Sequence, residues 1–103
     1  MVAMIYCFDI DETICNSQGL DYSNATPILE RIQKINRLHA QGHTIKLYTA
    51  RGSKTGIDWS EITRTQLVNW GLYFHELHFG KPFADYYVDD KAINESDFDW
   101  SSN

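Results

Sequence analysis

Short apolar runs recur along the chain and predict a series of buried strands. Residues 4–8 combine branched and aromatic side chains and end at Asp9, which is typical of a strand in the interior of a sheet. Residues 44–49 predict a second strand, residues 76–79 a third and weaker one, and residues 84–88 a fourth. Residues 11–24 are polar and mixed, which predicts a loop that can hold a small hairpin.

Two stretches with apolar residues at helical spacing separate these strands. Thr26 and Pro27 suit the start of the first helix, and Gly42 suits a left-handed end. Asp58 with Glu61 fits a capping box at the start of the second helix. The side of that helix predicted to be buried consists of Trp59, Ile62, Leu67 and Trp70.

Strands that alternate with helices predict an α/β fold with a mainly parallel sheet. In such sheets, ligands bind beyond the carboxyl ends of the strands. Several polar residues follow the expected strands at these ends, namely Asp9, Asp11, Thr49, Lys81, Asp89 and Asp90. Any one Asp after a strand is commonly a turn residue, but this set brings carboxylates, a hydroxyl and an amine to one edge.

Composition favours one folded domain, residues 1–103, with a core of its own, since 43% of the residues are hydrophobic and 14% aromatic. No apolar run approaches the roughly 20 residues that a membrane span needs, so we expect no membrane partner. The apolar start lacks a basic leader and is interpreted as a strand, which predicts a cytoplasmic location. Cys7 and Cys15 are expected to be reduced thiols.

The charge of the chain bears on its partners and cofactors. A net charge of −5 argues against nucleic acid as a general partner, since such binding needs a basic surface. Carboxylates gathered at one sheet edge would repel one another, and Mg²⁺, which prefers oxygen ligands, would relieve this repulsion. No group of Cys and His has the spacing of a zinc site.

These residues resemble the motifs of haloacid-dehalogenase-like (HAD) phosphatases. Asp9-Ile10-Asp11-Glu12-Thr13 resembles the DxDxT motif, and residues 47–51 resemble the second motif, an apolar strand that ends in Thr or Ser. Lys81 resembles the lysine of the third motif, and Asp89 and Asp90 the acidic pair of the fourth. The likeness spans residues 5–92 in the right order. Residues 48–52, 80–82 and 89–92 resemble those of small capless members of this family, the capsular polysaccharide biosynthesis phosphatases.

The resemblance implies a three-layer, Rossmann-like fold without a cap domain, and it implies a role for each matching residue. Asp9 would attack phosphorus, and Asp11 would act as general acid and base. Thr49 would bind a phosphoryl oxygen, Lys81 would offset negative charge, and Thr13 would help to fix the turn of the motif. The expected Mg²⁺ ligands are Asp9, Asp11 (through its carbonyl), Asp89 and Asp90.

Two departures from the family pattern have consequences. Glu12 stands where many members have Gly. Without a cap, the site would be open to solvent unless a second copy in a homo-oligomer covers it.

Arg51 and Gly52 directly follow the second motif and are candidate contacts to the phosphate or sugar of a substrate. The alternative is that they form a basic turn in which Arg51 caps a carboxylate.

The function expected is Mg²⁺-dependent hydrolysis of a phosphomonoester through a phospho-aspartate on Asp9. A small phosphorylated metabolite, such as a sugar phosphate, is the expected substrate class. Two alternatives remain open from the sequence. One is a phosphatase that acts on proteins or polynucleotide ends, and the other is a non-enzymatic module that binds Mg²⁺ or phosphate.

Overall fold

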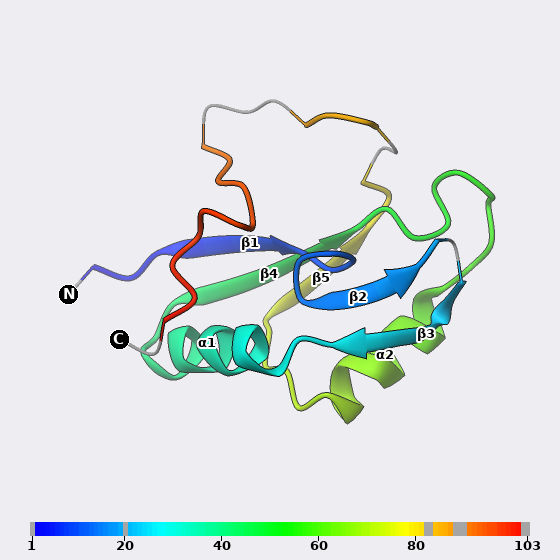
Figure 1. Cartoon of the computed structure of the whole chain (residues 1–103). Coiled ribbons are helices and arrows are strands. Elements are labelled where there is room, and N and C mark those ends of the chain that lie inside the picture. The colour runs from blue at the N-terminus through cyan, green and yellow to red at the C-terminus, as the bar shows by residue number, and fades with distance from the viewer. Residues whose placement is uncertain (1, 20, 82–83, 88–90, 102–103) are drawn as a thin grey trace.

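A parallel sheet lies at the centre of the structure, a computed structural model that describes residues 2–19, 21–81, 84–87 and 91–101. Its strands are β1 (Ile5–Asp9), β4 (Thr44–Thr49) and β5 (Glu76–Phe79), in the spatial order β1-β4-β5 (Figure 1). Phe8 lies beside Leu47, and Leu47 beside Leu77, so apolar side chains of neighbouring strands fall on one face. The three strands expected at these positions, and their parallel direction, are confirmed.

Both helices cover this apolar face. α1 (Leu29–Ala40) connects β3 to β4, and α2 (Ser60–Asn69) connects β4 to β5. Because both crossovers step across the sheet in the same direction, right-handed connections place both helices on the same side, as Figure 1 shows. One core cluster contains Phe8, Ile35, Leu47 and Leu67, from the sheet and both helices. The fold is thus a small, compact α/β arrangement of the Rossmann-like kind.

The opposite face of the sheet carries polar side chains and is open among the described residues. The Nζ atom of Lys46 lies 3.6 Å from Oε2 of Glu76. The rings of Tyr48 and His78 stack, with their centroids 5.0 Å apart. Ile5 on the same face is 66% exposed. The described part of the chain therefore has two layers, where three were expected. The sequence of β4 explains why one face of the sheet is uncovered. Apolar and polar residues alternate in this strand, whereas a strand covered on both faces of a sheet carries apolar side chains on both.

An antiparallel hairpin follows the first motif. It consists of β2 (Cys15–Gln18) and β3 (Asp21–Pro27), so the hairpin expected within residues 11–24 is confirmed and extends further. The expected helix start at Thr26 and Pro27 is wrong, because both residues pair with β2. Ile28 is the N-cap of α1, without a side-chain hydrogen bond, and the helix begins one residue later.

The second helix also begins differently from the expectation. The carboxylate of Asp58 accepts hydrogen bonds from the backbone and hydroxyl of Ser60, in place of a capping box with Glu61. Ile62, expected to be buried, is 40% exposed, while Thr63 is fully buried. The inner side of α2 is therefore partly polar, and these polar groups belong to the site described below.

The chain after β5 does not add a strand within its described part. Residues 84–87 form an irregular segment that runs above the sheet in Figure 1, so the fourth strand expected there is wrong for these residues. The later segment returns to the body, where Phe98 and Trp100 pack on Phe8 with ring centroids 5.6 and 5.7 Å away. Phe98 and Trp100 thus hold the tail to the body.

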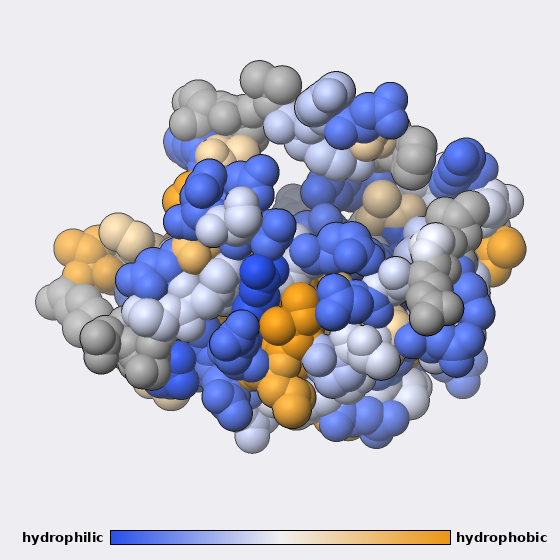
Figure 2. Space-filling model, viewed as in Figure 1, coloured by the Kyte–Doolittle hydropathy of each residue, from blue (hydrophilic) through white to orange (hydrophobic). Residues whose placement is uncertain are grey.

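The visible surface carries no large apolar area. In Figure 2 the face shown is mostly hydrophilic, with small and separate hydrophobic patches. None of the helices in the described part of the chain has the length and apolar character needed to cross a membrane.

Candidate active site

Asp9 and Lys81 meet at the carboxyl edge of the sheet. Asp9 is the last residue of β1, and Lys81 follows β5 after Gly80. The Nζ atom of Lys81 lies 3.6 Å from Oδ2 of Asp9, and their side chains are 22% and 36% exposed. The backbone N–H of Lys81 also donates to the carbonyl of Thr49 at 3.2 Å, which fixes this lysine beside the end of β4.

The carboxyl of Asp9 lies in a partly desolvated position. Burial raises the pKa of Asp9 above its ordinary value, and the nearby Lys81 opposes this shift without cancelling it. The charge of Asp11 raises the pKa further, by a smaller amount. A carboxylate that is poorly solvated in its ionised form gains from additional positive charge, which a cation bound nearby would supply.

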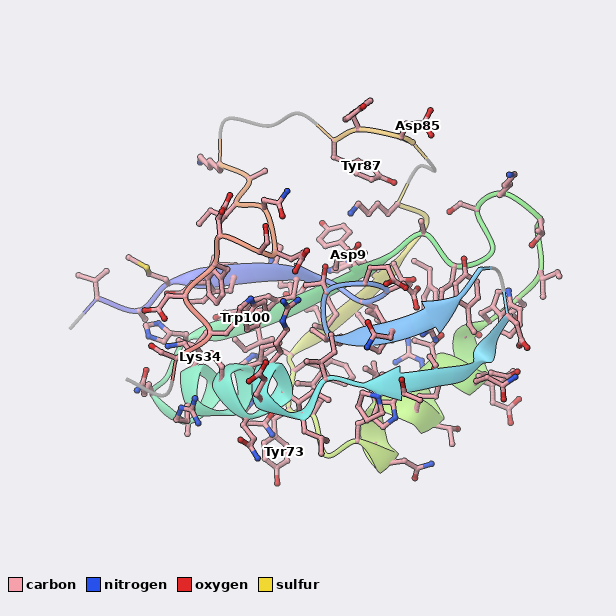
Figure 3. The ribbon with its side chains drawn as sticks, viewed as in Figure 1. Asp9, Lys34, Tyr73, Asp85, Tyr87 and Trp100 are labelled. Atoms are coloured by element: carbon pink, nitrogen blue, oxygen red, sulfur yellow. The ribbon has the colours of Figure 1, made fainter. Side chains whose placement is uncertain are left out.

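Tyr87 adds an aromatic group above this pair. The Nζ atom of Lys81 lies 4.0 Å from the centre of the Tyr87 ring, a cation–π contact. Figure 3 shows Tyr87 on the segment above the sheet edge, with its ring directed toward the side where Asp9 lies. Sequence reasoning placed this tyrosine in the sheet and its covering, and no pattern in the sequence indicated a contact with Lys81.

The turn after Asp9 has an unusual backbone. The amides of Thr13 and Ile14 both donate to the carbonyl of Ile10, which closes a tight turn around the motif. Glu12 has a φ of 65°, in the left-handed region that favours Gly. Its carboxylate accepts a hydrogen bond from the backbone of Ser17 at 2.9 Å, which ties the turn to β2. This conformation explains why Gly suits the position in similar motifs.

Arg51 holds the carboxylate of Asp11 in a two-pronged ion pair. Its Nε and Nη2 atoms lie 2.9 Å from Oδ2 and Oδ1 of Asp11, respectively. The arginine side chain is fully buried, and that of Asp11 is 20% exposed. Such paired contacts fix the plane of the carboxylate as well as its position. Of the two interpretations of Arg51 made from the sequence, the structure shows the contact with a carboxylate, in a buried setting.

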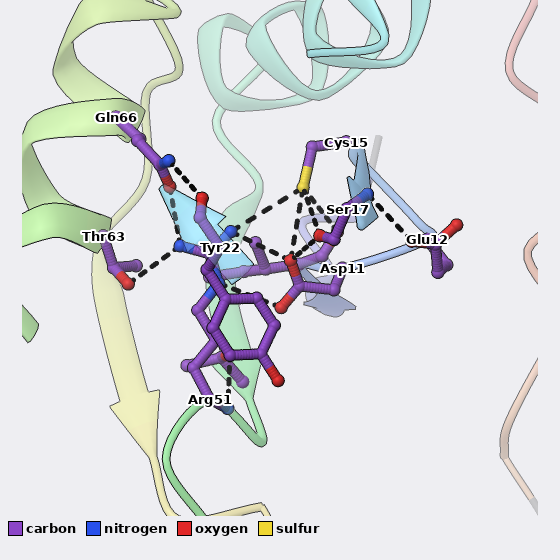
Figure 4. Close-up of polar contacts among 10 residues, drawn as sticks. Asp11, Glu12, Cys15, Ser17, Tyr22, Arg51, Thr63 and Gln66 are labelled. Carbon is purple, nitrogen blue, oxygen red and sulfur yellow. Dashed lines mark hydrogen bonds and ion pairs between the residues drawn. The ribbon is translucent and has the colours of Figure 1, made fainter. Parts of the chain in front are cut away.

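Polar residues of α2 and the hairpin complete the surroundings of Arg51 (Figure 4). Its Nη1 atom donates to the hydroxyl of Thr63 at 3.0 Å and to the side-chain oxygen of Gln66 at 2.6 Å. Gln66 in turn donates to the carbonyl of Tyr22, whose ring lies 4.8 Å from the guanidinium. Sequence reasoning missed this network. The available signal was the i, i+3 spacing of Thr63 and Gln66, which places both on one side of a helix.

Two more side chains contact Asp11 from β2. The hydroxyl of Ser17 donates to Oδ1 of Asp11, and the thiol of Cys15 donates to the same atom at 3.5 Å. Burial raises the pKa of Cys15 to about 12, with a further contribution from the charge of Asp11. A thiol with so high a pKa is not a nucleophile at neutral pH. The buried side chain of Cys15 is part of the core cluster.

Two further candidate residues, Thr49 and Thr13, make hydrogen bonds near the carboxyl edge of the sheet. Thr49 is fully buried at the end of β4, and its hydroxyl oxygen accepts a hydrogen bond from the backbone of Arg51 at 3.0 Å. The hydroxyl hydrogen of Thr49 can still donate. Thr13 contributes its carbonyl, which accepts a hydrogen bond from Arg31 at 3.0 Å. The structure thus brings Asp9 to Lys81 and Asp11 to Arg51, while Thr49 lies beneath them in the sheet.

A pocket of about 210 Å³ lies beside this edge. Its walls come from the loop between β4 and α2 and from the end of β5, and include Gly52, Ile57, Asp58, Trp59, Phe79 and Gly80. Gly52 has a φ of 83°, and a Cβ atom at this position would lie 2.2 Å from the carbonyl oxygen of Ile57. Gly52 is therefore required for the close approach of the two sides of the loop.

The described donors at this edge suit a hard cation. Asp9 offers a carboxylate of which one oxygen faces Lys81, in a side chain that is 36% exposed. The carboxylate of Asp11 is held by Arg51, which leaves the backbone carbonyl of Asp11 as the expected ligand. Oxygen donors of this kind fit Mg²⁺. Among the described residues, no group of three or more His, Cys, Asp or Glu side chains is placed to hold a metal. The other expected ligands, Asp89 and Asp90, lie outside the described residues.

The fold of this chain is similar to that of a solved protein. A protein from Vibrio cholerae, whose crystal structure was determined as an MCSG target, superposes with a TM-score of 0.82 and 28% sequence identity. The match covers 96% of this chain and 89% of that one. No protein-family model matches the chain, and no curated protein matches it. The fold of nearly the whole chain is thus similar to that of a solved protein.

Proposed function

We propose that the protein is a capless HAD-like phosphatase that hydrolyses a phosphomonoester through a phospho-aspartate on Asp9. The observation that carries the proposal is the ion pair between Asp9 and Lys81 at the carboxyl edge of the sheet, 3.6 Å apart. The two residues belong to the first and third motifs, which are distant in sequence. A nucleophilic carboxylate beside a lysine is the arrangement that transfer of a charged phosphoryl group requires.

In the first step, an oxygen of Asp9 attacks phosphorus and the bond from phosphorus to the leaving oxygen breaks. Asp11 gives a proton to the leaving oxygen, so that an alcohol departs. In the acid form that this step requires, the protonated oxygen of Asp11 no longer accepts from Arg51, so one of the two contacts seen here is lost. Lys81 offsets the negative charge that Asp9 and the phosphoryl group bring together. Thr49 donates its hydroxyl hydrogen to a phosphoryl oxygen after a small adjustment at the end of β4, because the hydroxyl is buried in this structure.

In the second step, Asp11 takes a proton from water as the water oxygen attacks phosphorus. The bond from phosphorus to Asp9 then breaks, and phosphate leaves with Asp9 and Asp11 restored. Both steps require Asp11 at a fixed distance from the phosphorus atom. Arg51 serves as a positioning residue here, since its two contacts at 2.9 Å set the orientation of the Asp11 carboxylate.

Mg²⁺, held by Asp9, the carbonyl of Asp11, Asp89 and Asp90, would supply positive charge against the phosphoryl oxygens. The raised pKa of Asp9 is consistent with a need for such charge, because the lysine alone does not offset the burial of this carboxyl.

The test is hydrolysis of p-nitrophenyl phosphate by the purified protein, with Mg²⁺ and with EDTA. We expect turnover that needs Mg²⁺ and that falls at least about a hundredfold in Asp9→Asn, since the nucleophile is removed. Asp97→Asn is the matched control, because it makes the same change in an exposed aspartate of the tail that belongs to none of the motifs. Turnover by Asp9→Asn close to that of the unaltered protein would contradict the proposal.

The same experiment separates the alternative functions. A folded protein that binds Mg²⁺ but hydrolyses none of p-nitrophenyl phosphate, sugar phosphates, phosphopeptides and 3′-phosphorylated oligonucleotides would be a binding module. Selective turnover of the phosphopeptide or the oligonucleotide would instead identify a protein or polynucleotide-end phosphatase.

A further inference from the structure

Tyr22 of the hairpin lies against the arginine that holds Asp11 (Figure 4). The centre of its ring is 4.8 Å from the central carbon of the Arg51 guanidinium, which is a cation–π contact. The Nε and Nη2 atoms of the same guanidinium lie 2.9 Å from the two carboxylate oxygens of Asp11. One side chain therefore separates the ring of Tyr22 from the carboxylate proposed as general acid and base.

The backbone and the ring of Tyr22 are both held in place. Gln66 donates to the carbonyl of Tyr22 at 2.6 Å and accepts from Arg51 at 2.6 Å, so one residue of α2 anchors both. The ring of Trp59 meets that of Tyr22 edge to face, with centroids 5.1 Å apart. Tyr22 is only 8% exposed. A side chain fixed in this way loses little freedom when a ligand binds.

The hydroxyl of Tyr22 reaches the surface although its ring is buried. Each fully buried side-chain nitrogen or oxygen atom in the described part of the chain has a hydrogen-bond partner. The phenol oxygen has no partner among the described residues, so it is not one of these buried atoms. Tyrosine commonly combines a packed ring with a polar tip in this way, and the tip is then available to a ligand.

Two carboxylates act on this hydroxyl. Burial raises the pKa of Tyr22 above its ordinary value, the charges of Asp11 and Asp9 raise it further, and the charge of Arg51 opposes them. Charge interactions weaken with distance, so the phenol lies near both carboxylates, and the effect of Asp11 is the larger. The phenol keeps its proton at neutral pH and is therefore a hydrogen-bond donor.

A phosphoryl group between these carboxylates would accept from such a donor. In the proposed reaction Asp9 bonds to phosphorus and Asp11 protonates the leaving oxygen, so the phosphoryl oxygens lie between the two. Arg51 has no N–H group left for them, because its five N–H groups donate to four side chains, those of Asp11, Cys15, Thr63 and Gln66. The hydroxyl of Tyr22 is the donor that remains on this side among the described residues.

We infer that the hydroxyl of Tyr22 donates a hydrogen bond to a phosphoryl oxygen of the substrate, on the side of Asp11. The inference rests on the proposed phosphatase function for the position of the phosphoryl group. It makes Tyr22 a catalytic residue that comes from the hairpin, a segment outside the four motifs. The phenol stays protonated in both steps, so the proton transfers of the proposed reaction are unchanged.

Tyr22→Phe tests the inference, because it removes the hydroxyl and keeps the ring against Arg51 and Trp59. We expect kcat/KM for p-nitrophenyl phosphate to fall about tenfold or more, the value of one hydrogen bond to a charged group. The Tm should stay close to that of the unaltered protein. Tyr73→Phe is the matched control, because Tyr73 is 62% exposed and precedes β5, at the edge of the sheet opposite Asp9. This control should change neither quantity.

Phosphate binding tests the same contact without turnover. In protein labelled with ¹³C at the Cζ atoms of tyrosine, the resonance that Tyr22→Phe lacks belongs to Tyr22, and the one that Tyr73→Phe lacks belongs to Tyr73. Inorganic phosphate added with Mg²⁺ should shift the Tyr22 resonance and leave that of Tyr73 in place.

The two readouts separate failure of the inference from failure of the proposed function. If the unaltered protein hydrolyses p-nitrophenyl phosphate, an equal kcat/KM in Tyr22→Phe overturns the inference while the function stands. A fall in kcat/KM that comes with a lower Tm also overturns it, since the hydroxyl would then serve packing. If the unaltered protein hydrolyses no phosphate ester, the proposed function fails. A phosphate-dependent shift of the Tyr22 resonance would still support the contact, and absence of that shift would contradict it.

Discussion

Two residues of the first motif are held in unfavourable conformations or surroundings. Glu12 adopts a φ of 65° and uses its carboxylate to hold the backbone of Ser17. Asp9 is kept in a position where its ionised form is poorly solvated. Each feature opposes stability, and each belongs to the edge where the proposed chemistry occurs. Strain and desolvation of this kind are common at functional sites.

Replacement of Glu12 tests the backbone strain. Glu12→Gly and Glu12→Ala both lose the hydrogen bond to Ser17, but only Gly relieves the left-handed conformation. We expect Glu12→Gly to be more stable than Glu12→Ala by about 1 kcal/mol, measured by urea denaturation. Equal stability of the two variants would show that Glu12 does not have a positive φ in solution.

The pH dependence of stability tests the burial of Asp9. Its pKa is raised in the folded state, so the unfolded chain loses the proton first as pH rises, and stability falls until Asp9 is ionised in both states. In metal-free buffer, Asp9→Asn should therefore raise the Tm at pH 7, and the gain should vanish near pH 3. A gain that is independent of pH, or a loss at pH 7, would contradict this account. Asp97→Asn provides the comparison for an exposed carboxylate.

At the scale of elements, the loop between β4 and α2 connects the first motif to the second helix. Arg51 at its start is bound by Asp11 from the first motif and by Thr63 and Gln66 from α2. The loop then closes on itself through Gly52 and Gly56. The start of β4 and the position of Lys81 were predictable from apolar runs and motif order. The network was not predicted, because the i, i+3 spacing of Thr63 and Gln66 shows that they share one side of a helix but not that this side is buried.

Two glycines of this loop form a matched pair for a test of its geometry. Gly52 and Gly56 have φ values of 83° and 76°, so an Ala at either position is strained. Only at Gly52 would the added Cβ atom also meet backbone, 2.2 Å from the carbonyl of Ile57, while at Gly56 it would meet open space. We expect Gly52→Ala to be less stable than Gly56→Ala by about 1–3 kcal/mol, measured by chemical denaturation. Equal losses would mean that the loop does not approach Ile57 so closely.

At the scale of the whole molecule, the sequence predicted the parallel sheet but not the number of layers. The alternation of Ile45, Lys46 and Leu47 indicates a strand that is covered on one face, and the structure agrees. The expectation of three layers came from the family resemblance, which outweighed this local pattern. The irregular segment at residues 84–87 was predicted as a strand because aromatic residues cluster there. Tyr86 is instead 87% exposed, and Tyr87 contacts Lys81.

The two cysteines differ in exposure, which provides a test of whether one face of the sheet is open. Cys7 is exposed on that face, while Cys15 is fully buried and its pKa is raised to about 12. A brief treatment of the native protein with iodoacetamide should modify Cys7 and leave Cys15 intact, as measured by mass spectrometry of peptides. Protection of Cys7 that disappears on dilution would show instead that a second copy covers this face, and modification of Cys15 would contradict the described packing.

The central claim is that a phosphoryl group is transferred to Asp9. In Asp11→Asn the attack can proceed on a substrate with a good leaving group, but the base for the second step is absent, so the intermediate should accumulate. The protein would be mixed with p-nitrophenyl phosphate and Mg²⁺, quenched in acid and analysed by peptide mass spectrometry. The account predicts one added phosphoryl group on Asp9, which hydroxylamine removes and which Asp9→Asn lacks. Release of p-nitrophenol with no phosphoryl group on Asp9, or with one on another residue, would contradict it.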